Sequence, residues 1–490
     1  MDERHKIIRD PVHGYIIIPD DLCQRFVDTP IFQRLRSIEQ TSMRCLFPGG
    51  RHDRFIHSLG VYHLAKRLYE GLLRNIRDNQ LQEIIGDPHL RKTFEVAALM
   101  HDCGHAPFSH TTEFLYNKYG ISNKAHDGTY IALQGVVDES ARAEFNFSGI
   151  KGKKPADHEA MSAYVLVSCF KEDLAQLDID ATLAARMITG VVHLRPTELR
   201  DRVENILIRL INGDAIDVDK LDYIVRDTWA SGVKNASIDI GRLLDAAIIK
   251  MDGDEPKFSY LSSALSVIQT VIDARNYLYE WIYGHHTVIY YAELLKRLCL
   301  ELGKVLEQDG CSADEILAKI FSPHAFIGDG VIHLATGTLF INLLNDGDVM
   351  AYLKRYLGNH PFYRAIEAHR PVHFALWKTE AEFKTFIQAD KQSAFDAERC
   401  AELFRTENGW SEEDCFTSTG MSSKLYDVEP KAVKILMPNG VVKAFTEVAN
   451  APTHPSISSK RNKPFGYIYI SKRFQTMCSQ LLDSINAYEW

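Results

Sequence analysis

Apolar residues recur every third or fourth position from about residue 29 to residue 298 of this 490-residue chain. Segments such as HSLGVYHLAKRLYEGLLRNI (57–76) and VENILIRLINGDAIDVDKLDYIVRD (203–227) place them on one face of a helix. A half-buried strand would need strict alternation instead. The spacing therefore predicts a mainly α fold, with a helical core that extends over residues 1–322.

The sequence changes character after about residue 322. HLATGTLFINLL, KAVKILMPNGVVKAFTEV and FGYIYISKRF mix strand-like and helix-like segments, and Asn439-Gly440 between two apolar runs indicates a hairpin. We predict a smaller α+β C-terminal lobe over residues 323–490, with regulatory or oligomerisation roles. Residues 116–157 interrupt the helical spacing with a basic, glycine-containing run, so we expect an insertion or long loop there.

Composition excludes several classes of protein. The first residues, MDERHKIIRD, have no apolar segment behind them, so we expect no secretory leader. No apolar run is long enough to span a membrane, and the nine cysteines form no CxxC pairs. We therefore expect a cytoplasmic protein without disulfides and without a membrane partner. A net charge of -9 argues against nucleic-acid binding as its main activity, because such surfaces are usually basic.

One short segment, LMHDCGHAPFSH (99–110), concentrates three histidines and an aspartate. His101 and Asp102 are adjacent, and Gly104 and Pro107 are expected to end a helix after Asp102 and turn the chain. That turn can bring His105 and His110 to the same pocket. An HD dipeptide alone is weak evidence, and a capping aspartate beside a packed histidine remains the alternative.

Other parts of the chain favour a metal site. His57 precedes an amphipathic helical segment, and Asp219 stands with further carboxylates among Ile, Val, Leu and Tyr. Buried carboxylates need partners, and a cation is the natural one. Mixed His and Asp ligands suit Mn, Fe, Mg or Zn, so the sequence predicts a divalent metal without identifying it.

Several longer motifs resemble a known family in the same order along the chain. They are IRDPVHGYI, VDTPIFQRLRSIEQ, FPGGRHDRFIHSLGV, HDCGHAPFSH, DHEAM, DVDKLDYIVRD and DARNYLYEWIY. This pattern resembles the HD-domain deoxynucleoside triphosphate triphosphohydrolases, the dNTPase and dGTPase family, over about residues 6–286. The vertebrate sterile-alpha-motif-and-HD members are the most similar known to us, and we expect this chain to lack their sterile-alpha-motif domain.

The resemblance implies an HD-type helical core and a set of site residues. Its metal ligands match His57, His101, Asp102 and Asp219. Its catalytic residues match His105, His110 and His158, with His110 as general acid, Glu113 as its partner and Glu159 beside His158. Its substrate contacts match Gln40, Arg54, Lys220, Tyr223, Asp227, Arg275 and Tyr283.

The implied reaction is metal-dependent hydrolysis of a dNTP at the α-phosphate, releasing deoxynucleoside and triphosphate. The sequence does not fix the base preference, and dGTP is one candidate. The biological role implied by the resemblance is control of dNTP pools or antiviral or anti-phage defence. No Gly-rich Walker loop is present, which excludes a P-loop ATPase.

The resemblance also implies regulation by a nucleotide activator in a homo-tetramer or another homo-oligomer. The activator contacts match Lys6, Asp28, Gln33 and Arg36, together with Arg242. Leu261, Ser263 and His286 stand where the family has basic residues of a second activator pocket. A different activator is therefore expected.

Two alternatives remain open from the sequence. One is an HD-family phosphodiesterase or phosphatase that acts on another nucleotide. The other is a nucleotide-sensing scaffold that binds nucleic acid and whose chemistry is incidental.

Overall fold

The computed structural model describes residues 4–119, 133–145, 157–233, 238–307, 312–327, 330–334, 337–392, 394–418, 430–449 and 466–488. Most of the predicted insertion at 116–157 lies outside these residues. Its prediction therefore stays a prediction.

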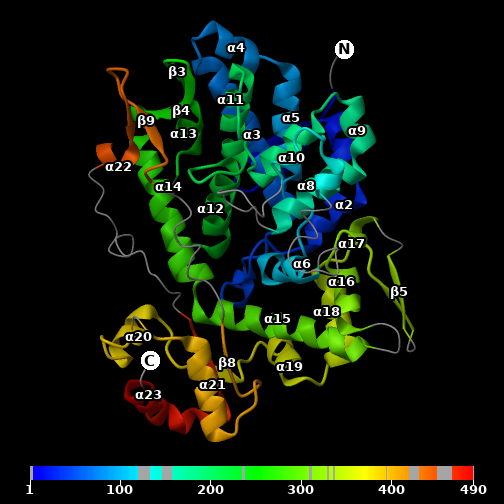
Figure 1. Cartoon of the computed structure of the whole chain (residues 1–490), viewed down its shortest axis with the longest axis vertical. Coiled ribbons are helices and arrows are strands. Elements are labelled where there is room, and N and C mark those ends of the chain that lie inside the picture. Colours follow the sequence, from blue (N-terminus) through cyan, green and yellow to red (C-terminus); the bar gives the residue numbers. More distant parts are fainter. Residues whose placement is uncertain are drawn as a thin grey trace.

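A helical core forms the larger part of the molecule, as the apolar spacing predicts (Figure 1). Its central helix, α3, is capped by Asp53 and packs against α5, α12 and α13. The helices from the N-terminus to the end of the core are α1 (Asp20–Leu22), α2 (Pro30–Gln33), α3 (Arg54–Asn75), α4 (Asn79–Ile85), α5 (Pro88–Met100), α6 (Phe114–Tyr119), α8 (Asp157–Cys169), α9 (Lys171–Gln176), α10 (Ala181–Thr189), α11 (Leu199–Ile211), α12 (Val218–Ser231), α13 (Ile240–Asp245), α14 (Leu265–Tyr277), α15 (His286–Leu306), α16 (Ala313–Ile320) and α17 (His324–Ile327). None of the helices in the described residues combines the length and the apolar character needed to cross a lipid bilayer.

A smaller α+β part follows the core and confirms the predicted fold class. In Figure 1, the long helix α15 lies between the core and α20, α21 and α23. A three-stranded antiparallel sheet of order β7-β11-β8 packs among these helices. The elements of this part are β5 (Val331–Leu334), β6 (Gly337–Phe340), α18 (Asp346–Leu357), α19 (Pro361–Glu367), β7 (His373–Ala375), α20 (Glu380–Phe386), α21 (Ala397–Asn408), β8 (Cys415–Thr417), β9 (Lys434–Leu436), β10 (Val442–Ala444), α22 (Phe445–Val448), β11 (Ile468–Ser471) and α23 (Cys478–Ala487).

Two hairpins lie within the helical core, and the helical prediction did not include them. β1 (His5–Asp10) pairs with β2 (Gly14–Pro19), and β3 (Ala247–Asp252) pairs with β4 (Glu255–Leu261). The second hairpin has a visible signal, because AIIKMDGDEPKFSYL contains a DG turn between two segments of strand-forming residues.

The predicted hairpin at Asn439-Gly440 joins β9 to β10 and is confirmed. These strands extend the sheet of the core in the order β10-β9-β4-β3, with β9 parallel to β4. Chain segments on either side of residue 322 thus share one sheet. The boundary between residues 322 and 323 stays a prediction.

Candidate metal centre

The four predicted metal ligands come from the ends of three helices. His57 lies in the first turn of α3, His101 and Asp102 follow the end of α5, and Asp219 lies in the first turn of α12. Because α3 packs against both α5 and α12, these three helix ends meet. The sequence analysis expects the helix to end after Asp102, whereas α5 ends at Met100, and His101 and Asp102 lie in the turn that follows.

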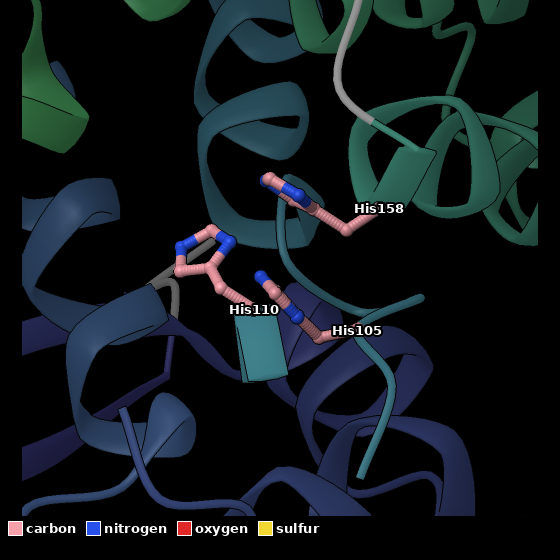
Figure 2. A group of neighbouring side chains, drawn as sticks. All are labelled: His105, His110 and His158. Atoms are coloured by element: carbon pink, nitrogen blue, oxygen red, sulfur yellow. The ribbon is translucent and has the colours of Figure 1, made fainter. Parts of the chain in front are cut away.

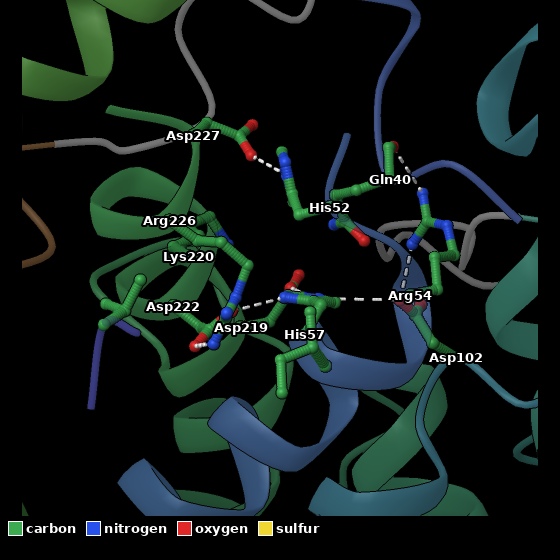
Figure 3. A network of polar contacts seen from close by, with 12 residues as sticks. Gln40, His52, Arg54, His57, Asp102, Asp219, Lys220, Asp222, Arg226 and Asp227 are labelled. Carbon is green, nitrogen blue, oxygen red and sulfur yellow. Dashed lines mark hydrogen bonds and ion pairs between the residues drawn. The ribbon is translucent and has the colours of Figure 1, made fainter. Parts of the chain in front are cut away.

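The ligand atoms of these residues lie close together, and Figure 3 shows three of the residues, His57, Asp102 and Asp219. His57 Nε2 lies 3.0 Å from Asp219 Oδ1 and 3.5 Å from Asp102 Oδ2. His101 Nε2 lies 3.5 Å from Asp102 Oδ1 and 3.7 Å from Asp219 Oδ1. Two atoms that bind one cation at about 2.1 Å are separated by similar distances.

The orientation of the two imidazoles also fits a metal ion. His57 Nδ1 lies 2.7 Å from Asp222 Oδ2, and His101 Nδ1 lies 2.9 Å from the carbonyl oxygen of Ala98. Each Nδ1 therefore donates a proton, which leaves the lone pair on Nε2. Both Nε2 atoms are buried and face the carboxylates of Asp102 and Asp219.

The charges around this point favour a cation. Burial lowers the pKa of His57, but Asp219, Asp222 and Asp102 outweigh burial and raise it to about 10, so without a cation Nε2 carries a proton that metal binding would displace. Burial raises the pKa of Asp219, but His101 and His57 hold it well below its ordinary value. These carboxylates therefore stay ionised beside the two imidazoles, and the donor set is one that binds a divalent metal.

A second buried network contacts Nδ1 of His57 through Asp222 (Figure 3). The sequence analysis did not predict this network. Asp222 accepts from His57 and from Arg226 Nε and Nη2, at 2.8 and 2.9 Å, and lies 2.5 Å from His13 Nε2. Arg226 Nη1 also donates to Asp10 Oδ2 at 2.8 Å. Asp10 and His13 lie in the motif IRDPVHGYI, and Asp222 and Arg226 lie in DVDKLDYIVRD. These motifs contain more polar residues than the predicted ligands account for, which is the signal that could have found them.

The predicted catalytic histidines form a second cluster next to the first (Figure 2). The ring of His105 stacks on that of His158 with centroids 4.1 Å apart, and the ring of His110 meets both edge to face. Glu113 joins two of them, since its Oε2 lies 2.7 Å from His110 Nδ1 and its Oε1 2.6 Å from His158 Nδ1. His110 is 55% exposed and His105 is fully buried, so His110 faces the open side.

Glu113 determines the charge of His158 but not that of His110, because burial, Arg54 and His158 outweigh Glu113 and lower the pKa of His110 to about 4. Burial lowers the pKa of His158, but Glu113 and Glu159 outweigh it and raise the pKa to about 9. Burial raises the pKa of Glu113, but His158 and His110 hold it well below its ordinary value. Glu159 follows His158 directly on α8.

Two of the predicted substrate residues, Arg54 and Lys220, lie beside the predicted metal ligands. Arg54 is buried and donates from Nη1 to Asp102 Oδ2 at 2.5 Å, from Nε to Ser109 Oγ at 2.8 Å and from Nη2 to the Gln40 carbonyl at 3.4 Å. Lys220 Nζ donates to Asp217 Oδ2 at 2.5 Å and to the carbonyl of Gly213 at 2.9 Å.

The remaining substrate residues lie around α12 and α14. The guanidinium of Arg275 lies 4.2 Å from the centre of the Tyr279 ring, and burial raises the pKa of Tyr223 well above its ordinary value. The hydroxyl of Tyr283 donates to Asp227. His52, which the sequence analysis missed, lies 2.5 Å from Asp227 Oδ1 through its Nε2.

Four of the five predicted activator residues lie together near β1. Lys6 Nζ donates to Asp28 Oδ1 at 2.9 Å, and Arg36 Nε donates to Gln33 Oε1 at 2.8 Å. Gln33 Nε2 donates to the carbonyl of Val27, which links the two pairs. The fifth residue, Arg242, is exposed on α13, a separate element.

Comparisons with known proteins agree with the resemblance that the motifs predict. Residues 54–139 match the HD domain family. The deoxynucleoside triphosphate triphosphohydrolase SAMHD1 of Gallus gallus is 33% identical over 291 residues, which are 57% of this chain and 42% of that protein. The SAMHD1 homolog of Dictyostelium discoideum is 28% identical over 286 residues, 57% of this chain and 46% of that protein.

The chain thus spans less than half the length of these curated relatives. A solved structure of a hypothetical protein from Aquifex aeolicus has the same fold, with a TM-score of 0.62 and 21% identity over 98% of this chain and 100% of that chain. The predicted resemblance is confirmed, and together with the HD domain it supports a hydrolase.

Proposed function

We propose that this protein is a metal-dependent dNTP triphosphohydrolase. The chain contains an HD domain and resembles the deoxynucleoside triphosphate triphosphohydrolases over 57% of its length. The convergence of His57, His101, Asp102 and Asp219 on one point carries the proposal. The reaction is cleavage of the bond between the α-phosphorus and the 5′ oxygen by water. The products are a deoxynucleoside and triphosphate.

His57, His101, Asp102 and Asp219 are the residues that would hold the metal. A divalent cation held by these residues would polarise a phosphoryl oxygen and activate water for attack. The mixed nitrogen and oxygen donors suit Mn, Fe, Mg or Zn. Asp222 keeps His57 in the tautomer that a metal ligand needs.

Four residues bind the triphosphate in this proposal. Arg54, Lys220 and Arg275 supply positive charge, and Tyr223 supplies a hydroxyl donor. All lie on or next to α3, α12 and α14 around the metal ligands. Their charges attract the polyanion and stabilise the negative charge that develops in the transition state.

His110 is the proposed general acid, because departure of the 5′ oxygen near neutral pH requires a proton. Its exposure and its bond to Glu113 support this role, since the ring reaches the open side and the carboxylate orients it. Glu113 also holds His158, which stacks on His105. These two rings complete the wall of the site, with Glu159 beside His158.

Gln40, Asp227 and Tyr283 are proposed to recognise the sugar. Gln40 and Asp227 present polar groups to the 3′-hydroxyl, and the ring of Tyr283 packs against the deoxyribose and excludes a 2′-hydroxyl. The bond from Tyr283 to Asp227 supports this arrangement, because it fixes the position of the ring.

We further propose that a nucleotide activates the enzyme by binding near Lys6, Asp28, Gln33 and Arg36, in a homo-tetramer or another homo-oligomer. The direct contacts within this group support a common role. Arg242 would join the site only if another subunit or a rearrangement brings it near. Control of dNTP pools and antiviral defence are the biological roles proposed for the reaction.

The test is a chromatographic analysis of products with each dNTP in Mn²⁺ or Mg²⁺, alone and with each other nucleotide added. We expect deoxynucleoside and triphosphate from the wild type and none from His101→Ala. His89→Ala serves as a control, because this histidine is exposed and its contact is with Asp178. Release of diphosphate or monophosphate would favour a phosphatase or phosphodiesterase, and salt-dependent binding of single strands without turnover would favour a scaffold.

A further inference from the structure

The segment from Leu344 to Asp346, which begins α18, contacts the loop that carries the catalytic histidines. Asp346 Oδ1 accepts a hydrogen bond from the backbone N–H of Phe108 at 2.6 Å. Asp346 Oδ2 accepts one from the backbone N–H of Glu39 at 2.9 Å. One carboxylate therefore joins the loop before His110 to the segment that leads to Gln40.

The backbone of this loop has an unfavourable conformation where Asp346 binds it. Phe108 and Ser109 have φ values of 61° and 54°, in the left-handed region that residues with a Cβ rarely adopt. Such a conformation persists only where the surroundings impose it. The N–H of Phe108 bonded to Asp346 is a contact that can impose it.

This backbone conformation determines the positions of two residues of the proposed site, Ser109 and His110. Ser109 Oγ accepts from Arg54 Nε at 2.8 Å and donates to the carbonyl of Glu39. His110 follows directly and reaches Glu113. A change in the backbone at Phe108 would therefore move both the partner of Arg54 and the proposed acid.

A second contact from the same segment fixes the other end of the loop. Arg34 is buried and donates to the carbonyl of Leu344 at 2.8 Å and to that of His105 at 2.6 Å. The loop is thus held at His105 through Arg34 and at Phe108 through Asp346. Leu344 and Asp346, which make these contacts, lie in the sequence after the predicted core boundary.

We propose that Asp346 is a positioning residue, which acts through the backbone of Phe108 and Glu39 to hold His110 and Arg54 in place. This proposal rests on the function proposed above, because it assigns the roles of His110 and Arg54 from it. Asp346 does not touch the reacting atoms. Its effect is expected on turnover through His110 and on substrate binding through Arg54, and not on metal binding.

The test is Asp346→Asn, compared with Asp348→Asn on the same helix. An amide has one acceptor oxygen, so in Asp346→Asn either Phe108 or Glu39 loses the acceptor of its N–H. Asp348 instead accepts from the N–H of Asn345 at 3.0 Å and caps the helix. The control therefore makes the same change from carboxylate to amide on α18 without touching the loop.

We expect kcat of Asp346→Asn to fall about 10- to 100-fold, since small displacements of catalytic groups have effects of this size. KM should rise as well, because Arg54 belongs to the proposed triphosphate site, whereas bound metal should stay at the wild-type value and Asp348→Asn should keep its kcat. Phe108→Gly in the Asp346→Asn background should recover part of kcat, because glycine adopts the left-handed conformation without a Cβ penalty. If Asp346→Asn does not fold, Asp346→Glu replaces it, with both acceptors kept and a smaller loss expected.

An unchanged kcat, an equal loss in Asp348→Asn, or a loss of metal would overturn the proposal. Amide hydrogen exchange at Phe108 separates this proposal from the proposed function. Faster exchange in Asp346→Asn than in Asp348→Asn is expected even if the wild type releases no triphosphate. Unchanged exchange would overturn the positioning role by itself.

Discussion

Asp222 offers a sharp test of how the chain orients a metal ligand. Its Oδ2 faces His57 Nδ1 and Arg226 Nε, and its Oδ1 faces His13 Nε2 and Arg226 Nη2. In Asp222→Asn, an NH₂ group replaces one of these oxygens. Whichever way the amide turns, its NH₂ faces an N–H of Arg226, because a guanidinium has only donors. Either orientation leaves buried donors without an acceptor.

The structure sets the expected size of the effect. Asp222 and Arg226 are fully buried, and breaking a buried ion pair costs about 3–5 kcal/mol. Arg226 keeps its contact with Asp10 at 2.8 Å, so we expect a loss of about 3 kcal/mol in the free energy of unfolding. Metal affinity should fall about 10- to 100-fold, because His57 loses the partner that orients it.

Two assays separate these effects. Urea denaturation of the metal-free protein measures the loss of stability, and titration calorimetry with Mn²⁺ measures the affinity. Asp245→Asn is the matched control, since Asp245 pairs with Arg74 on the surface, with both side chains more than half exposed. Its free energy of unfolding should change by less than about 0.5 kcal/mol. Wild-type Mn²⁺ affinity in a destabilised Asp222→Asn would refute the role assigned to Asp222.

Three further predictions address the metal, the histidine cluster and pH. Treatment with EDTA should abolish triphosphate release and lower the melting temperature, and added Mn²⁺ should restore both; activity that survives complete metal removal, checked by elemental analysis, would contradict the metal site. Glu113→Gln should lower kcat at least about tenfold, because it removes the charge shared by His110 and His158, and steady-state kinetics at several pH values would reveal a smaller effect. Burial raises the pKa of Asp346 to about 7 against two backbone N–H groups that lower it. The folded state therefore binds a proton that the unfolded state loses near pH 4, so this group's contribution to stability is full below pH 4 and disappears as the pH rises through 7. Urea midpoints from pH 4 to 8 should depend less on pH in Asp346→Asn, and parallel curves for the two proteins would exclude this contribution.

Local patterns in the sequence predict individual helices and hairpins, but they do not predict which distant segments pair. The apolar spacing predicts the helices that carry the ligands, and the Asn439-Gly440 pair predicts the hairpin that joins β9 to β10. The pairing of β9 with β4 was not predicted, because it joins segments separated by more than 170 residues in the sequence. Periodicity within a segment carries no information about its distant partner.

In the candidate site, too, the predicted ligands are found together, but the contacts made by residues distant in the sequence were not predicted. The resemblance nominates His57, His101, Asp102 and Asp219, and the structure brings them together. The sequence analysis missed Asp222 and Arg226, which form the buried network at His57 Nδ1. Their spacing does not distinguish them from the other polar residues of the same motif. Asp346 is the extreme case, because its contacts with Glu39 and Phe108 cross 307 and 238 positions.

Gly60 shows how such a buried network constrains a helix that local propensity would disfavour. Glycine within a helix costs about 1 kcal/mol relative to alanine, yet Gly60 lies inside α3, one turn after His57. A Cβ at this position would lie 1.9 Å from Asp222 Oδ1 and 2.5 Å from Arg226 Nη2. The side chain that glycine lacks would therefore occupy the space of the carboxylate that orients His57. The glycine weakens the helix, but it leaves space for a charged pair from α12 to reach His57, so stability is exchanged here for the geometry of the candidate site.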